Sequence, residues 1–306
     1  MMTKPELDID AARAAINRIS RLNLKQTSID KLKEDLIPVF CGYTQTTWRY
    51  DPGVELFRAR RVDKPVHVCS LLYPPEGVAP LNRANRKGGS VLYCCSAREP
   101  AFFELFPSAE TANAGDTLVI SKWVTTASLL VNHVGFTSQA FEKLGSRQYE
   151  ALWGDRVKDH GEVNSEISAF LADIFTQRIP ENENYRHKLS VAVAEKLFSG
   201  DMFDALLYPS IAANANCDNL AIKPRYADAN LRFLRAEFVR INAVRDLAVD
   251  TTVLDTAVTV DDDGTIQWRG HGDQWVLRKK GDELTMTAEN GRWVGRDADG
   301  RIVEPE

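Results

Sequence analysis

The sequence lacks the features that define several large classes of protein. In its 306 residues, no apolar stretch approaches the roughly 20 residues that a membrane-spanning helix requires. The start of the chain has no apolar segment of the kind found in secretory signals. Basic residues do not dominate, because 38 Lys and Arg stand against 43 Asp and Glu, which disfavours a general electrostatic interaction with nucleic acid. We therefore expect a cytoplasmic protein that binds neither a membrane nor nucleic acid.

Cysteine is scarce and shows no metal-binding spacing. The five cysteines are an odd number, and no C-x-x-C occurs. Cys94 and Cys95 are adjacent and would point to opposite faces of a strand, which disfavours a disulfide framework or a zinc site. The five histidines are dispersed, and no P-loop, G-x-G-x-x-G, G-x-S-x-G or H-E-x-x-H motif occurs. We therefore expect reduced cysteines and no bound metal.

The helix and strand patterns that are present divide the chain into three expected domains within an α+β fold. Residues 1–50 are predicted to form a helical preface, and residues 51–244 a mixed sheet core with flanking helices. Residues 245–306 contain four turn pairs between short apolar runs, which predicts a small C-terminal antiparallel meander. One of these turns, Asp261–Gly264, lacks the first acidic ligand and the bidentate glutamate of a calcium loop and is predicted to be a hairpin turn. The expected apolar face of the meander consists of Trp268, Trp275 and Trp293.

Capping residues predict where the N-terminal helices begin. Asp8 or Asp10 can cap the first helix, and Thr27 or Ser28 can cap the second. Both helices carry apolar residues at helical spacing, which predicts an inward face. The preface should therefore pack on other parts of the chain through this face.

The main domain contains the strongest helical pattern, which covers residues 167–179. Asn164 or Ser165 can cap this helix. Short runs rich in Val, Leu and Tyr, bounded by Gly, Pro and Asn, predict the strands. These runs cover residues 54–60, 66–73, 89–96, 116–125, 204–210 and 219–223, and a longer one lies within 231–241.

Several residues of the main domain could carry chemistry, although each also has a plain structural interpretation. Arg58 ends a predicted strand and could be a solvated strand edge. Arg83 and Asn85 lie in a polar, proline-rich loop, a kind of segment that often carries binding groups. Glu104 lies among bulky apolar residues and could simply face solvent on a helix. The remaining candidates are Tyr93 in a core strand, and Tyr208 and Ser210 at the end of a late strand.

Taken in order, these residues resemble the pattern of the RES-domain family. The strand that bears Arg58 is followed by N-R-A-N, V-L-Y, A-F-F-E, L-Y-P-S and then N-L-A-I-K. The resemblance covers residues 55–242. It implies a fold similar to that of ADP-ribosylating toxins, and consumption of NAD by phosphorolysis or hydrolysis of its nicotinamide–ribose bond. Many family members are toxins of bacterial toxin–antitoxin pairs, so an antitoxin or a second copy of the chain is an expected partner.

The resemblance also assigns roles to the candidate residues. An arginine can bind the pyrophosphate of NAD through its planar fork. A carboxylate can stabilise the oxocarbenium-like state in which a glycosidic bond breaks. The nicotinamide ring is cationic while it is bonded in NAD, so it can leave without protonation, and neither a paired acid and base nor a cofactor beyond the substrate NAD is implied. The residues expected to be catalytic are Arg58, Glu104 and Ser210, and those expected to bind NAD are Arg83, Asn85, Tyr93 and Tyr208.

Three functions are consistent with this pattern. The first is cleavage of NAD with transfer of ADP-ribose to phosphate or water. The second is transfer of ADP-ribose to a protein. The third is a catalytically silent RES-like scaffold whose C-terminal β region binds a partner.

Overall fold

The chain has a mixed α+β structure, as predicted. The computed structural model describes residues 8–106, 113–146, 161–198, 202–245, 248–279, 282–289, 292–297 and 299–303. Contacts between residues divide the chain into two compact units. The first unit contains residues 1–54, 73–96 and 125–231, and the second contains residues 55–72, 97–124 and 232–306.

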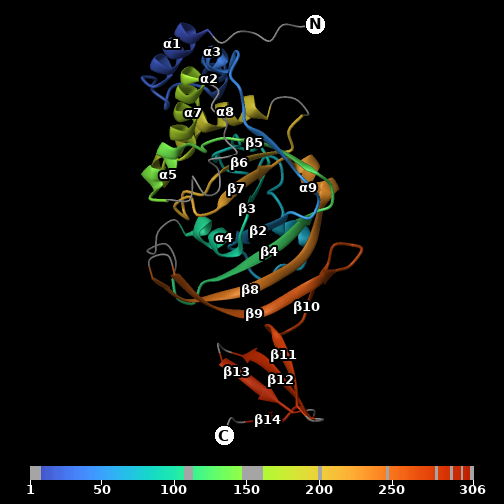
Figure 1. Ribbon diagram of the computed structural model, residues 1–306. Helices are drawn as coiled ribbons and strands as arrows, with labels where there is room; N and C mark the ends of the chain where they lie inside the picture. The colour runs from blue at the N-terminus through green and yellow to red at the C-terminus, as the bar shows by residue number, and fades with distance from the viewer. Residues whose placement is uncertain are drawn as a thin grey trace. The chain divides into compact units, whose positions relative to one another are not determined.

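The first unit combines a mixed sheet with helices (Figure 1). Its helices are α1 (Ile9–Ile19), α2 (Ile29–Asp35), α3 (Ile37–Phe40), α5 (Ser138–Leu144), α7 (Glu162–Phe175), η3 (Glu181–Arg186), α8 (His187–Leu197) and α9 (Pro224–Asn230). Its strands are β1 (Thr47–Tyr50), β3 (Leu92–Cys95), β5 (Leu129–His133), β6 (Ala205–Pro209) and β7 (Asp218–Ile222). In the sheet the strands follow the order β1, β5, β6, β7, β3. Strands β5 and β6 run parallel, whereas the other neighbours run antiparallel.

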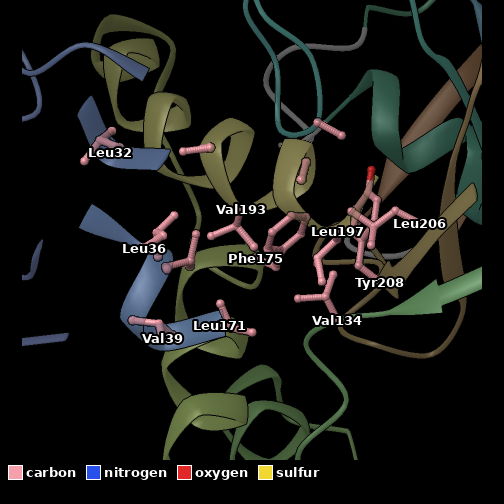
Figure 2. Close-up of a cluster of buried hydrophobic side chains, with 14 of the residues drawn as sticks. Leu32, Leu36, Val39, Val134, Leu171, Phe175, Val193, Leu197, Leu206 and Tyr208 are labelled. Atoms are coloured by element: carbon pink, nitrogen blue, oxygen red, sulfur yellow. The ribbon is translucent and has the colours of Figure 1, made fainter. Parts of the chain in front are cut away.

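A continuous apolar core joins the N-terminal helices to this sheet. Leu32 and Leu36 are fully buried and pack with residues of α7 and α8 in one cluster. Figure 2 shows the cluster extending from Leu36 through Phe175 and Val193 to Leu206 on β6. The inward face predicted for the N-terminal helices is confirmed. These helices are therefore part of the packed first unit.

Two of the predicted caps are confirmed. The Asp8 carboxylate accepts a hydrogen bond from the Ala11 amide at the start of α1, and the Ser28 hydroxyl accepts one from the Lys31 amide at the start of α2. Each cap satisfies an amide that has no partner inside its helix.

The predicted cap of α7 is wrong. The helix begins one turn earlier, with Gly161 as its N-cap, so Asn164 lies inside the first turn. The Asn164 side chain is buried and bonds both backbone groups of Thr44, accepting from its amide at 2.8 Å and donating to its carbonyl at 3.1 Å. The Asn164 side chain, which the sequence suggested as a cap, therefore bonds the distant backbone of Thr44 instead.

The second unit contains antiparallel strands, one α-helix and one short 3-10 helix in its described residues. Its elements are β2 (Glu55–Arg60), η1 (Val68–Leu71), α4 (Arg98–Leu105), β4 (Thr117–Thr125), β8 (Leu231–Arg245), β9 (Ala248–Val260), β10 (Ile266–Trp268), β11 (Gln274–Lys279), β12 (Asp282–Glu289), β13 (Arg292–Arg296) and β14 (Ile302–Val303). Strands β2, β4, β8, β9 and β10 are neighbours in this order, and β11 to β14 form a sheet of their own (Figure 1).

The strands after residue 245 divide between these two sheets. The expected boundary at 244/245 falls within the last residues of β8, which pairs antiparallel with β9, and β10 pairs with β9. Asp261–Gly264 forms the predicted turn between β9 and β10. Trp268 on β10 donates its indole N–H to the Pro65 carbonyl at 2.8 Å. The side chains of Trp275 and Trp293 lie outside the described part of the chain.

The strand predicted over residues 66–73 is wrong, because its centre is the 3-10 helix η1. His67 precedes this turn and accepts a hydrogen bond from the Cys69 amide at its Nδ1. Its other ring nitrogen, Nε2, lies 2.7 Å from the carbonyl oxygen of Asp263. The ring thus holds η1 against the turn between β9 and β10, a long-range contact that the composition of the run does not reveal.

Candidate functional site

The seven residues named by the resemblance lie in both units. The first unit contains the expected NAD-binding residues and Ser210. The second unit contains Arg58 and Glu104.

Tyr93 organises the loop that precedes its strand. Its hydroxyl accepts a hydrogen bond from the Ala84 amide at 2.9 Å and donates one to Asn85 Oδ1 at 2.7 Å. The buried Asn85 amide also donates to the carbonyls of Pro80 and Arg86, both at 2.8 Å. These polar groups are therefore engaged in shaping the loop.

Arg83 is held by the end of helix α7. Its Nη1 donates to the Phe175 carbonyl at 2.6 Å and its Nη2 to the Gln177 carbonyl at 3.1 Å. Carbonyl groups at a helix C-terminus lack partners within the helix and carry partial negative charge, so they favour a cation. Two bonds from one planar group also fix the orientation of that group. Arg83 is thus a half-buried, oriented positive charge.

Tyr208 lies on the same face of the sheet as Tyr93. Tyr93 pairs with Ala221, which pairs with Leu206 on β6, and Tyr208 is two residues further along β6. The rings of Tyr208 and Phe175 meet edge to face, with centroids 5.7 Å apart (Figure 2). Through Phe175, Tyr208 is linked to the site of Arg83.

Ser210 follows β6 and begins a tight turn. It is fully buried, and its hydroxyl accepts a hydrogen bond from the Ala213 amide at 3.2 Å. In the same turn, Asn214 and Ala215 have φ of 50° and 56°, a region that costs free energy for residues with a Cβ. Ser210 therefore lies where the backbone is strained.

Arg58 and Glu104 lie on two elements that pack against each other, β2 and α4. Arg58 is half-buried, and its Nε atom is removed from solvent. Glu104 is exposed, whereas Ala101 and Phe102 of the same helix are buried. Helix α4 thus presents a carboxylate on its polar face while its apolar face anchors it.

Further contacts fix the position of α4. Arg98 in its first turn donates to the Glu237 carboxylate at 2.6 Å. At its end, the guanidinium of Arg61 lies 4.1 Å from the centroid of the Phe106 ring. Arg61 directly follows β2, so both ends of the helix are attached to strands of the second unit.

Two residues of the first unit were missed by sequence reasoning. His187, the first residue of α8, is 8% exposed, and its buried Nδ1 atom has no hydrogen-bond partner among the residues that the structure describes. Burial and the nearby positive charge of Arg83 lower its pKa to about 4. The second is Arg86, which forms ion pairs with Asp30 and Glu195. Neither residue stands out locally, since one is an isolated histidine and the other belongs to a polar loop.

Comparisons with known proteins add no functional assignment. No protein-family model matches the sequence, and no curated protein matches it either. Among the described residues, no group of three or more His, Cys, Asp or Glu side chains is placed to hold a metal ion. No helix in the described ranges is both long and apolar enough to cross a membrane.

Proposed function

We propose that this protein binds NAD and cleaves its nicotinamide–ribose bond, passing ADP-ribose to phosphate or water within a RES-like fold. One observation carries the proposal. Residues that the resemblance selects from distant parts of the sequence are joined in the first unit, through Asn85, Tyr93 and Arg83 and then through Phe175 to Tyr208. A single dinucleotide must contact such residues together, so their proximity supports a common role.

The contacts of the loop change the role we assign to two of them, Tyr93 and Asn85. Tyr93 and Asn85 have engaged polar groups, and so we assign them to shaping the loop and, for Tyr93, to presenting a ring surface. Arg83 is oriented by two carbonyls, so its charge is preorganised for the pyrophosphate of NAD. A group that is already oriented pays less entropy when its ligand binds.

Arg58 and Glu104 are assigned to the reacting bond. Breaking the nicotinamide–ribose bond places positive charge on the ribose, because the transition state resembles an oxocarbenium ion. The Glu104 carboxylate would stabilise this charge, and Arg58 would bind a phosphate of the ADP-ribose part. Nicotinamide leaves as a neutral molecule, since the bonding electrons neutralise its ring cation, and phosphate or water then forms the new bond at the ribose.

The experiment is incubation of the purified protein with NAD, with and without phosphate, followed by identification of all products. Nicotinamide with ADP-ribose 1″-phosphate indicates phosphorolysis, and nicotinamide with free ADP-ribose indicates hydrolysis. Label from NAD on a protein would instead establish ADP-ribosyl transfer. A folded protein that releases no nicotinamide and labels no protein would refute the proposal and leave the catalytically silent scaffold.

A further inference from the structure

Arg86 lies in an ion-pair cluster between the loop of the expected site and two helices. On one side it bonds both carboxylate oxygens of Glu195 on α8, from Nη2 at 2.9 Å and from Nε. On the other side it bonds both oxygens of Asp30 on α2, from Nη1 at 3.1 Å and Nη2 at 2.5 Å. Lys33 on α2 also donates to Glu195, at 2.6 Å. One guanidinium thus forms hydrogen bonds with two carboxylates from two different helices.

The cluster lies at the boundary between core and solvent. The side chains of Arg86 and Glu195 are 37% and 26% exposed, whereas Asp30 is 70% exposed. Burial alone would raise the pKa of Glu195, but the hydrogen bonds from Arg86 and Lys33 outweigh it and lower that pKa. The hydrogen bond from Arg86 likewise lowers the pKa of Asp30. Both carboxylates are therefore held in the charged form.

The loop that contains Arg83 and Arg86 is attached to the rest of the first unit at three places. Tyr93 on β3 holds Ala84 and Asn85, and the end of α7 holds Arg83. Arg86 supplies the third attachment, through α8 and α2. Because Arg83 and Arg86 are three residues apart, displacement of Arg86 shifts the backbone that carries Arg83. Bidentate arginine–carboxylate pairs have a fixed geometry, which suits such an attachment.

We propose that Arg86 is a positioning residue for NAD binding, and that Asp30 makes the geometry of the loop depend on helix α2. Helix α2 then contributes to NAD binding, since it supplies one of the two carboxylates that orient the loop. The effect on NAD rests on the function proposed above, whereas the effect on the loop does not.

The experiment compares Arg86→Gln and Asp30→Asn with the wild type. Glu34→Gln is the matched control, because Glu34 is an exposed acid on the same helix whose pair with Lys31 is 3.6 Å long. The KM for NAD should rise about tenfold in Arg86→Gln and about threefold in Asp30→Asn, with kcat per folded molecule nearly unchanged, since a bidentate charged pair fixes geometry as well as charge. The double variant should be no worse than Arg86→Gln, because both changes remove one interaction.

A second readout follows the loop itself. Hydrogen–deuterium exchange of the Ala84 and Gly88 amides, which donate to Tyr93 and to the Ala79 carbonyl, should accelerate in both variants and not in Glu34→Gln. A general loss of folding would instead accelerate exchange throughout α7 and α8. Unchanged exchange in the loop of Arg86→Gln overturns the proposal, as does an unchanged KM in an active protein.

The two proposals fail in distinguishable ways. If the wild type does not consume NAD, the proposed function fails, and exchange in the loop alone decides whether Arg86 positions it. If the wild type consumes NAD and Arg86→Gln behaves as the wild type in both measurements, only the positioning role fails.

Discussion

At the scale of single residues, each unit contains a charged candidate residue whose position is fixed by its own surroundings. Arg83 is oriented by two carbonyls, and Glu104 is carried on a helix with a buried apolar face. Catalysis of glycosidic cleavage requires groups that meet the transition state without rearranging. A substitution that removes the negative charge of Glu104 tests its proposed role in turnover directly.

Replacing Glu104 by glutamine should separate binding from turnover. The change keeps the shape of the side chain and removes its negative charge, so NAD should bind with nearly unchanged affinity. Turnover should fall by roughly two to three orders of magnitude, the loss typical of one preorganised electrostatic group. Steady-state kinetics and NAD binding measure the two effects. Glu99→Gln, on the same helix and also exposed, is the control and should retain turnover.

The free energy of unfolding should depend on His187 at acid pH. The pKa of His187 is about 4 in the folded protein, below the 6.5 of an ordinary histidine. Between these values the unfolded chain binds the proton more tightly, so stability is fully present above pH 6.5 and is lost as the pH falls towards 4. The loss should reach about 3 kcal/mol at pH 4, since each pKa unit corresponds to about 1.4 kcal/mol and half of the folded molecules carry the proton at that pH.

Denaturant titrations at pH 7 and pH 4.5 test this dependence. The wild type should lose more stability between the two pH values than His187→Gln, which has no proton to bind at this position. Equal losses in the two proteins would show that other groups cause the acid destabilisation.

At the scale of elements, side chains from one segment fix the conformation of another. His67 joins η1 to the turn between β9 and β10, and Asn164 ties the backbone at Thr44 to α7. Lys188 on α8 donates to the carbonyls of Leu24, Lys25 and Thr27, which holds the connection between α1 and α2. The conformation of these loops therefore depends on hydrogen bonds to distant segments more than on the residues of the loops themselves.

The turn at Gly264 provides a sharp test of such a contact. Its φ is +89°, and a Cβ at this position would overlap the imidazole of His67. Gly264→Ala should therefore lower the free energy of unfolding by about 2–3 kcal/mol, from backbone strain and loss of the His67 contact. Gly270→Ala is the matched control, because its φ is +81° but no atom of the described ranges lies within 4 Å of a Cβ there.

Denaturant unfolding should show a loss of only about 1 kcal/mol in that control, from backbone strain alone. In the background of His67→Ala, the cost of Gly264→Ala should shrink towards the same value. A cost at Gly264 that is independent of His67 would contradict the steric explanation.

At the scale of the whole molecule, the C-terminal strands serve two sheets. Strands β9 and β10 extend the sheet of β2, β4 and β8, whereas β11 to β14 pair among themselves. Asp273, which precedes β11, pairs with Arg235 on β8 at 2.5 Å. Whether the second unit of a truncated chain folds should therefore depend on the residue at which the chain ends.

A chain that ends after Asp273 should fold and retain any NAD cleavage, because the residues assigned to the reaction all precede that point. A chain that ends after Arg245 should lose soluble folded protein, since removal of β9 leaves the long edge of β8 without its partner. Size-exclusion chromatography, thermal unfolding and NAD turnover compare the two. Loss of turnover in a folded chain ending at Asp273 would assign the small sheet a direct role.

The sequence by itself determined the features that rest on local physics. Capping by Asp8 and Ser28, the apolar spacing of α7 and the turn at Asp261–Gly264 each depend on residues a few positions apart. The candidate residues were also chosen from sequence, by the order of short motifs. For these features, neighbouring residues contain nearly all the information that decides the outcome.

Only the tertiary structure decided the features that depend on distant partners. Asn164 bonds Thr44 instead of capping α7, and η1 forms where a run rich in Val and Leu predicted a strand. The tertiary structure also joined Arg83 to the end of α7 and placed Arg86 between α2 and α8. In each case a polar group is satisfied by a segment far away in the chain, and burial makes an unsatisfied polar group costly, so the long-range partner overrides the local preference.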